Sequence, residues 1–118
     1  MLFDRINELI KYINENISDT TLQIDMIASH MAVSVSTLTR MTKSAMGVTP
    51  GLFLAKARIR RASMLLSKHT HATIAEVAYE CGFSDPKYFS RCFKSEMKMT
   101  PSEYIRNAAK NQNEETAG

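Results

Sequence analysis

Apolar residues recur every three or four positions along most of this 118-residue chain, which is the spacing of one face of an α-helix. Helical stripes cover residues 2–17, 24–31, 34–46, 50–68 and 74–81, a sixth stripe begins at residue 86, and a seventh runs from residue 101 to near Asn107. No segment alternates apolar and polar residues as a half-buried strand does. The pattern predicts an all-α fold of seven helices.

Residues that begin or end helices stand between the stripes. Ser34 and Ser36 are candidate caps for the third helix, and Gly47 is the residue expected to end it in a left-handed conformation. Three later helices begin with a capping side chain followed by proline at the first helical position: Thr49-Pro50, Asp85-Pro86 and Thr100-Pro101. After Asn107 the chain is small and polar, so residues 108–118 are expected to form a disordered tail.

The chain also repeats itself at an interval of about 50 residues. Each copy has the layout of a helix-turn-helix: a short helix with an alanine, a small residue in the turn (Ala32, Gly82), and a capped second helix. The matched pairs are Ile24 and Ile74, Ala28 and Ala78, Ser34 and Ser84, Arg40 and Arg91, and Thr49-Pro50 and Thr100-Pro101. We therefore expect a first unit in residues 1–50, a linker helix at 51–68 and a second unit in residues 69–107.

The charges are distributed unevenly around a formal net charge of +3. Residues 1–25 carry a net charge of −3, residues 26–75 hold seven basic residues and no acid, and residues 76–118 carry −1. A stretch of fifty residues without a carboxylate is typical of a protein that binds phosphates, although a solvated basic face would look the same.

The second helix of each unit presents one polar face. At 100° per residue, Ser36, Thr39, Arg40 and Lys43 lie together on the third helix, and Lys87, Ser90, Arg91 and Lys94 lie together on the sixth. Arginine can bind both major-groove acceptors of guanine, hydroxyls can donate or accept, and lysine can reach phosphate. The pattern favours double-stranded DNA as the partner; the alternative is that Arg40 and Arg91 form surface ion pairs only.

Residues 5–106 resemble the DNA-binding domain of AraC/XylS transcription regulators, most specifically in the second half of the chain. The resemblance rests on Arg58-Ile59, Ala62 and Leu65-Leu66, then on Ile74-Ala75, Val77-Ala78 and Gly82-Phe83-Ser84-Asp85, and finally on Tyr88-Phe89-Ser90-Arg91, Phe93-Lys94, Thr100-Pro101 and Tyr104. It implies two helix-turn-helix units joined by a long linker helix, with both recognition helices in successive major-groove segments. The residues that it implies contact bases are Ser36, Thr39, Arg40, Pro86, Lys87, Ser90 and Arg91. Lys43 and Lys94 are the expected phosphate contacts.

Two positions depart from the family pattern. Lys98 stands where the family usually has glycine before the last Thr-Pro, and Ser36 stands where some members carry a large aromatic residue. Proline at position 86 has no side-chain donor, so its contribution to base reading is limited. These departures leave the DNA sequence that is bound open.

Other chemistries find little support in the sequence. His69 and His71 have no cysteine or acid nearby to complete a metal site, and Cys81 and Cys92 fit small core positions better than nucleophiles. No phosphate loop, carboxylate pair or nucleophile constellation appears, so we expect neither an enzyme nor a cofactor. The alternative to DNA binding is a helical protein-interaction module that kept the fold.

The same composition bears on location and partners. No stretch is apolar enough to span a membrane and no signal peptide is recognisable, so we expect a cytoplasmic protein. RNA polymerase and a sensory domain in the same natural chain are candidate partners. Both a short stand-alone regulator and the C-terminal piece of a larger one fit the length.

Overall fold

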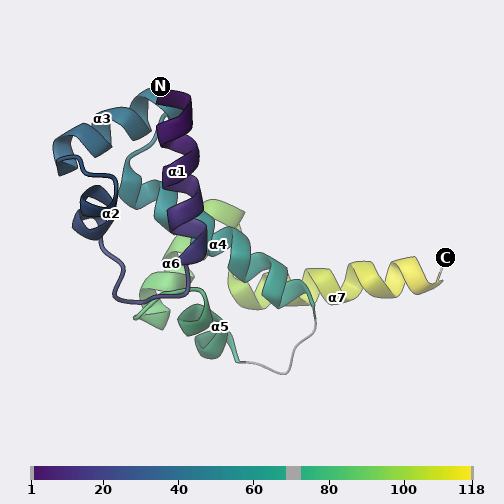
Figure 1. Cartoon of the computed structure of the whole chain (residues 1–118). Helices are drawn as coiled ribbons and strands as arrows, with labels where there is room; N and C mark the ends of the chain where they lie inside the picture. Colours follow the sequence, from purple (N-terminus) through teal and green to yellow (C-terminus); the bar gives the residue numbers. More distant parts are fainter. Residues whose placement is uncertain (1, 69–72, 118) are drawn as a thin grey trace.

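The structure, a computed structural model, describes residues 2–68 and 73–117. Within these ranges it contains helices and no strand, which confirms the predicted all-α fold (Figure 1). The elements are α1 (Leu2–Glu15), α2 (Ile24–His30), α3 (Val35–Met46), α4 (Pro50–Ser67), α5 (Ile74–Glu80), α6 (Pro86–Met97) and α7 (Pro101–Ala117).

The first three helices and the start of α4 enclose one apolar core. Its buried members come from each of these helices because the helical stripe of each turns toward the others. They include Leu9 and Ile13 of α1, Ile27 of α2, Leu38 of α3 and Leu54 of α4. Burial of each such side chain stabilises the fold by about 1.5–3 kcal/mol.

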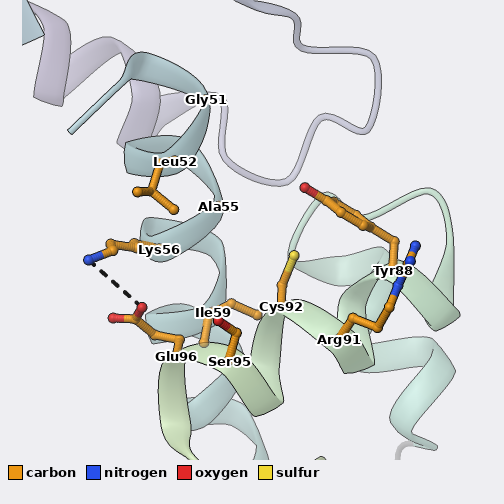
Figure 2. Close-up of a pocket in the computed structure, with 10 residues that line it drawn as sticks. All are labelled: Gly51, Leu52, Ala55, Lys56, Ile59, Tyr88, Arg91, Cys92, Ser95 and Glu96. Carbon is orange, nitrogen blue, oxygen red and sulfur yellow. Dashed lines mark ion pairs between the residues drawn. The ribbon is translucent and has the colours of Figure 1, made fainter.

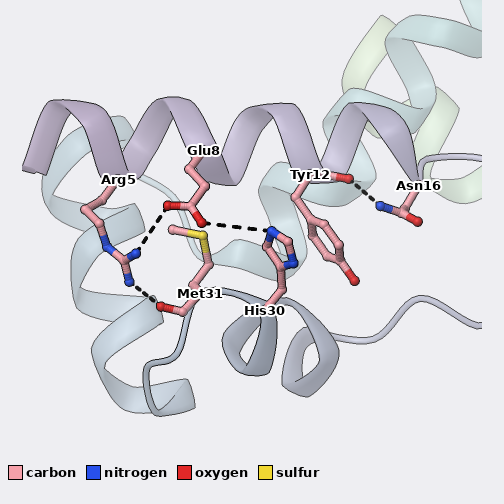
Figure 3. A network of polar contacts seen from close by, with 6 residues as sticks. All are labelled: Arg5, Glu8, Tyr12, Asn16, His30 and Met31. Carbon is pink, nitrogen blue, oxygen red and sulfur yellow. Dashed lines mark hydrogen bonds and ion pairs between the residues drawn. The ribbon is translucent and has the colours of Figure 1, made fainter.

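Polar and aromatic contacts attach α1 to the end of α2 (Figure 3). Arg5 donates one hydrogen bond to Glu8 and another to the backbone carbonyl of Met31. The His30 ring stacks on Tyr12 with centroids 3.9 Å apart, and its Nε2 lies 3.9 Å from the Glu8 carboxylate. The acidic first helix thus packs on the first helix-turn-helix unit from outside.

A second core lies between α4, α5, α6 and α7. Its centre is aromatic: the Phe89 ring contacts Phe83 and Phe93, and Phe93 meets Tyr104 of α7 edge to face at 5.5 Å. Val77, Ala78 and Cys81 complete it from α5 and the turn that follows. Burial raises the pKa of the Cys81 thiol to about 11, which agrees with the expected core role.

Helix α4 belongs to both cores. Leu54 near its beginning enters the first, whereas Ile59, Ala62 and Leu66 farther along enter the second. Figure 1 shows α4 running between the two units. A rigid helix shared by two cores fixes the distance and rotation between them.

Helix ends follow the same geometry in both units. Ser34 and Asp85 cap α3 and α6 by accepting hydrogen bonds from backbone amides, as Thr49 does for α4. The equivalent turn residues Ala32 and Gly82 have φ of 57° and 93°, and the equivalent helix-ending residues Gly47 and Lys98 have φ of 75° and 65°. The left-handed conformation expected at Gly47 is therefore confirmed, and Ala32, Gly82 and Lys98 adopt it too.

The sequence-based end of the seventh helix is wrong. Helix α7 continues from Pro101 to Ala117, over most of the segment assigned to a disordered tail, and projects from the body of the molecule (Figure 1). Between Asn107 and Gly118 there is no proline or glycine, and the alanine, lysine, glutamine and glutamate residues there favour helix. The prediction had relied on the missing apolar stripe, which reports packing rather than helix propensity.

None of the helices in the described ranges has the length and apolarity needed to cross a membrane.

Gly82 should tolerate no side chain, in contrast to Gly47. A Cβ at Gly82 would collide with the Ile17 carbonyl oxygen and lie 2.6 Å from Arg58 Nε, whereas a Cβ at Gly47 meets nothing within 4 Å. Gly47→Ala carries only left-handed strain, roughly 1 kcal/mol, while Gly82→Ala should cost more than about 2 kcal/mol because the clash adds to the strain. Urea unfolding of the two variants compares these costs, and equal losses would contradict the packing described here.

Candidate nucleic-acid interface

Helix α3 turns its apolar stripe inward and its polar face outward. Leu38 and Thr42 are fully buried, and the Thr42 hydroxyl donates to the Leu38 carbonyl at 2.7 Å. On the opposite side Ser36, Arg40 and Lys43 are exposed and Thr39 is half-buried. All four candidate residues of the first unit therefore share one side of the helix.

Helix α6 repeats this arrangement. Phe89 and Phe93 are buried, Lys87, Arg91 and Lys94 are exposed, and Pro86 and Ser90 are half-buried. Asp85 accepts a hydrogen bond from the backbone amide of Lys87 at 3.0 Å, which fixes the first turn on which Lys87 stands. The structure thus brings the candidates of the second unit onto one face as well.

The hydroxyl of Thr39 has a defined role in its own helix. It donates to the Val35 carbonyl at 2.9 Å, so its proton is used within α3. The oxygen lone pairs and the methyl group remain available to a ligand. Thr39 is therefore suited to accept a hydrogen bond or to make an apolar contact.

The cations of both faces lie apart from carboxylates. Among the described side chains, no carboxylate forms an ion pair with Arg40, Lys43, Lys87, Arg91 or Lys94; the pairs present are Arg5 with Glu8, His30 with Glu8, and Lys56 with Glu96. The alternative that Arg40 and Arg91 serve only in surface ion pairs thus finds no support in this part of the chain. Two cationic faces without countercharges remain for a polyanion.

One arginine of the basic stretch is not on the surface. Arg58 is 9% exposed, its Nε donates to the Ile17 carbonyl at 3.2 Å, and a terminal nitrogen donates to the Asp19 carbonyl at 2.8 Å. Its guanidinium also lies over the Phe83 ring, 6.0 Å from the centroid. Burial lowers the pKa of Arg58, and the Asp19 charge opposes that change. Arg58 belongs to the acid-free stretch whose charge is typical of phosphate binding, but the structure makes it a link between the two units.

A cleft of about 470 Å³ separates α4 from α6 (Figure 2). Leu52 and Lys56 border it from α4, and Tyr88, Arg91 and Glu96 border it from α6. The Lys56 ammonium lies 3.9 Å from the Glu96 carboxylate, so this basic residue too is less available than the charge count suggested. The polar face of α6 therefore borders a groove rather than a flat surface.

Sequence reasoning also missed two neighbours of the candidate arginines. Thr37 accepts a long hydrogen bond of 3.4 Å from Arg40, and the Tyr88 ring lies under the Arg91 guanidinium at 5.7 Å. The repeat could have pointed to them, because Thr37 and Tyr88 occupy equivalent positions 51 residues apart.

The two histidines that were weighed as metal ligands, His69 and His71, lie outside the described residues, in the gap at 69–72. Within the described ranges no three metal-ligating side chains gather. Cys92 is half-buried beside the cleft and Cys81 is buried.

A family of helix-turn-helix domains, of the AraC/XylS type, matches residues 27–107. The chain belongs to this family. The match begins within α2 and ends within α7, so it includes the second helix of each helix-turn-helix unit and the linker between the units.

Individual relatives agree with this assignment. The HTH-type transcriptional activator RhaS of Escherichia coli O139:H28 is 35% identical over 97 residues, which are 82% of this chain and 34% of RhaS. This chain therefore spans about a third of the length of that relative. A transcriptional regulator with an AraC-type DNA-binding domain from Chromobacterium violaceum has 29% identity and a TM-score of 0.80, and the match covers 90% of this chain and 93% of that one.

The DNA-binding domain of AdpA, a global transcriptional factor whose structure was solved with a target DNA, shares the fold. Its TM-score is 0.84 at 22% identity, and the match covers 91% of this chain and 95% of that one. The two solved structures thus share the all-α arrangement of this chain, and RhaS is a sequence relative that is named a transcriptional activator.

Removal of the Arg58 guanidinium should destabilise the domain without changing the number of phosphate contacts. Arg58→Met leaves two backbone carbonyls without their donor, at a cost of about 1–3 kcal/mol. The matched control is Arg60→Met, an exposed arginine two residues along α4, which should change stability by less than about 0.5 kcal/mol. Urea unfolding measures the stability of both variants, and equal midpoints would show that the contacts of Arg58 do not contribute to the stability of the domain.

Proposed function

We propose that this chain reads a specific sequence of duplex DNA with α3 and α6, placed in successive segments of the major groove. The observation that carries the proposal is the repeated polar face: each unit presents an arginine, a hydroxyl and a lysine beside a capped helix start. No carboxylate among the described side chains pairs with any of these cations. A surface that only solvates the domain would not need the same constellation twice.

The side chains divide by chemistry into those that read bases and those that hold the backbone. The arginines stand one turn into each helix, where a helix in the major groove comes closest to base edges. We assign base contacts to Ser36, Thr39, Arg40, Pro86, Lys87, Ser90 and Arg91. Lys43 and Lys94 follow the arginines by three residues on the same faces, and we assign them to phosphates.

The proposal includes a wider setting. The RhaS relative is named a transcriptional activator, and this chain matches about a third of it. We therefore propose that the two units, residues 1–50 and 69–107, act together across the linker at 51–68, in the cytoplasm, under the control of a sensory domain in the same natural chain. RNA polymerase is the proposed protein partner, because an activator must act on the transcription machinery.

Salt dependence tests the electrostatic part of the proposal. If six to eight phosphates are neutralised, the plot of log affinity against log salt for a random duplex should have a slope of about −5 to −7. Fluorescence anisotropy with a labelled duplex between low and moderate salt measures it. A flat response, or no binding at low salt, favours the protein-interaction module instead.

Single substitutions distinguish the residues assigned to bases from those assigned to phosphates. Arg40→Ala and Arg91→Ala should each cost about 1–3 kcal/mol on a selected high-affinity duplex and relax selectivity at one or two base pairs. Lys43→Ala and Lys94→Ala should weaken selected and random duplexes equally and reduce the salt slope by about one. Binding titrations on both duplexes distinguish the two classes.

Thermal unfolding is the control for these four variants. Their side chains point away from the buried Leu38 and Phe89, so the midpoint should scarcely move. If the arginine variants unfold instead, the arginines are structural and the assigned recognition face is wrong.

A further inference from the structure

The two recognition arginines each contact the residue three positions earlier on the same helix. In α3 that residue is Thr37, whose hydroxyl accepts from Arg40 at 3.4 Å. In α6 it is Tyr88, whose ring lies under the Arg91 guanidinium, 5.7 Å from the carbon at its centre. Residues three apart lie on the same side of a helix, so both contacts follow from the repeat.

Each of these neighbours is itself held in place. Thr37 lies in the cap of α3: its amide donates to Ser34 Oγ at 3.1 Å, and Ser34 Oγ donates to the Thr37 hydroxyl at 3.0 Å. The Tyr88 ring packs at 6.1 Å against Phe83, which is buried in the second core. A held neighbour can restrict a long flexible side chain, whereas a mobile one cannot.

Resting on the proposed function, we propose that Thr37 and Tyr88 are positioning residues that hold Arg40 and Arg91 in the orientation used to read bases. Neither needs to touch DNA for this role. An arginine that is already ordered loses less side-chain freedom when it forms its two hydrogen bonds to a base.

The two contacts differ in kind, and they therefore restrict the two guanidinium groups to different degrees. A hydroxyl acceptor fixes one nitrogen of the Arg40 guanidinium at one point. An aromatic face attracts a cation over its whole area, so Arg91 keeps some freedom to slide. Figure 2 shows Tyr88 and Arg91 together at the edge of the cleft between α4 and α6, and Tyr88 is 49% exposed there.

The test is a double-mutant cycle on Tyr88 and Arg91. The probe is the tightest duplex that the wild-type chain recovers from a random-sequence library, with a scrambled duplex for comparison. Tyr88→Leu should weaken binding to the selected duplex by about two- to five-fold, as expected for an exposed cation–π contact. Tyr88→Phe keeps the ring and should bind within about 1.5-fold of wild type. In the Arg91→Ala background, Tyr88→Leu should have no further effect.

Tyr79→Leu is the matched control. Tyr79 is also a tyrosine with 49% exposure, but it lies on α5, and neither the hydrogen bond of Arg40 nor the cation–π contact of Arg91 involves it. Its replacement should leave the selectivity ratio unchanged. Thermal unfolding of every variant identifies any loss of fold.

The α3 pair provides an independent cycle should Tyr88→Leu unfold. Thr37→Val removes the hydroxyl and keeps the shape, Thr37→Ser restores an acceptor, and Arg40→Ala completes the cycle. Loss with valine, recovery with serine and no effect without Arg40 support the inference.

Additive effects in the double variants would overturn the inference, since a positioning residue acts only through its arginine. Loss of selectivity in Tyr88→Phe equal to that in Tyr88→Leu would overturn it too. Failure of the proposed function looks different: the wild-type chain would then bind selected and scrambled duplexes equally before any variant is compared.

Discussion

The guanidinium of Arg58 holds together three segments that are far apart in sequence. From the middle of α4 it donates to the carbonyls of Ile17 and Asp19 in the loop after α1, and it lies over Phe83 in the turn of the second unit. Burial of a charge is costly unless hydrogen bonds and a favourable ring contact offset it, as they do here. Both units pack on α4, and this one side chain adds a direct contact between them.

That tie explains why the two copies of the repeat have not kept the same residues. Gly82 lies against Ile17 and Arg58, so both its left-handed φ and the absence of a Cβ are required. The equivalent Ala32 is exposed and bears only the backbone cost, roughly 1–2 kcal/mol. At the helix ends the roles are exchanged: Gly47 sits in open space, while Lys98 takes the left-handed conformation and donates from its ammonium to the Ser95 carbonyl. Glycine is required at position 82, where its neighbours leave no space for a Cβ, whereas Ala32 and Lys98 show that other residues can occupy positions where only the left-handed φ matters.

Much of this architecture could be predicted from local signals. Periodicity located the helices, cap residues such as Ser34 and Asp85 located their starts, and the repeat indicated equivalent faces. The burial of Arg58 was missed although helical spacing points to it: Arg58 stands four residues from both Leu54 and Ala62 and so lies on the buried side of α4, unlike the exposed Arg60 and Arg61. Its hydrogen bonds to the carbonyls of Ile17 and Asp19 could not be predicted, because they depend on the tertiary packing. The end of α7 was missed because helix propensity can extend a helix beyond the residues that pack, where there is no apolar stripe to indicate it.

The basic residues divide into cations that are held by internal polar contacts and cations of the candidate site that have no carboxylate partner among the described side chains. Within the basic stretch, Arg58 donates its hydrogen bonds to backbone carbonyls and Lys56 forms an ion pair with Glu96. Neither can therefore bind a phosphate without breaking an internal contact. Arg40 and Arg91 instead contact a hydroxyl and a ring, which orient a guanidinium but do not neutralise it. A cation that is ordered and still carries its full charge is suited to recognition, because it combines geometric selectivity with attraction to a polyanion. The physical difference between the arginine that builds the domain and those suited to read DNA is therefore the partner that each guanidinium finds.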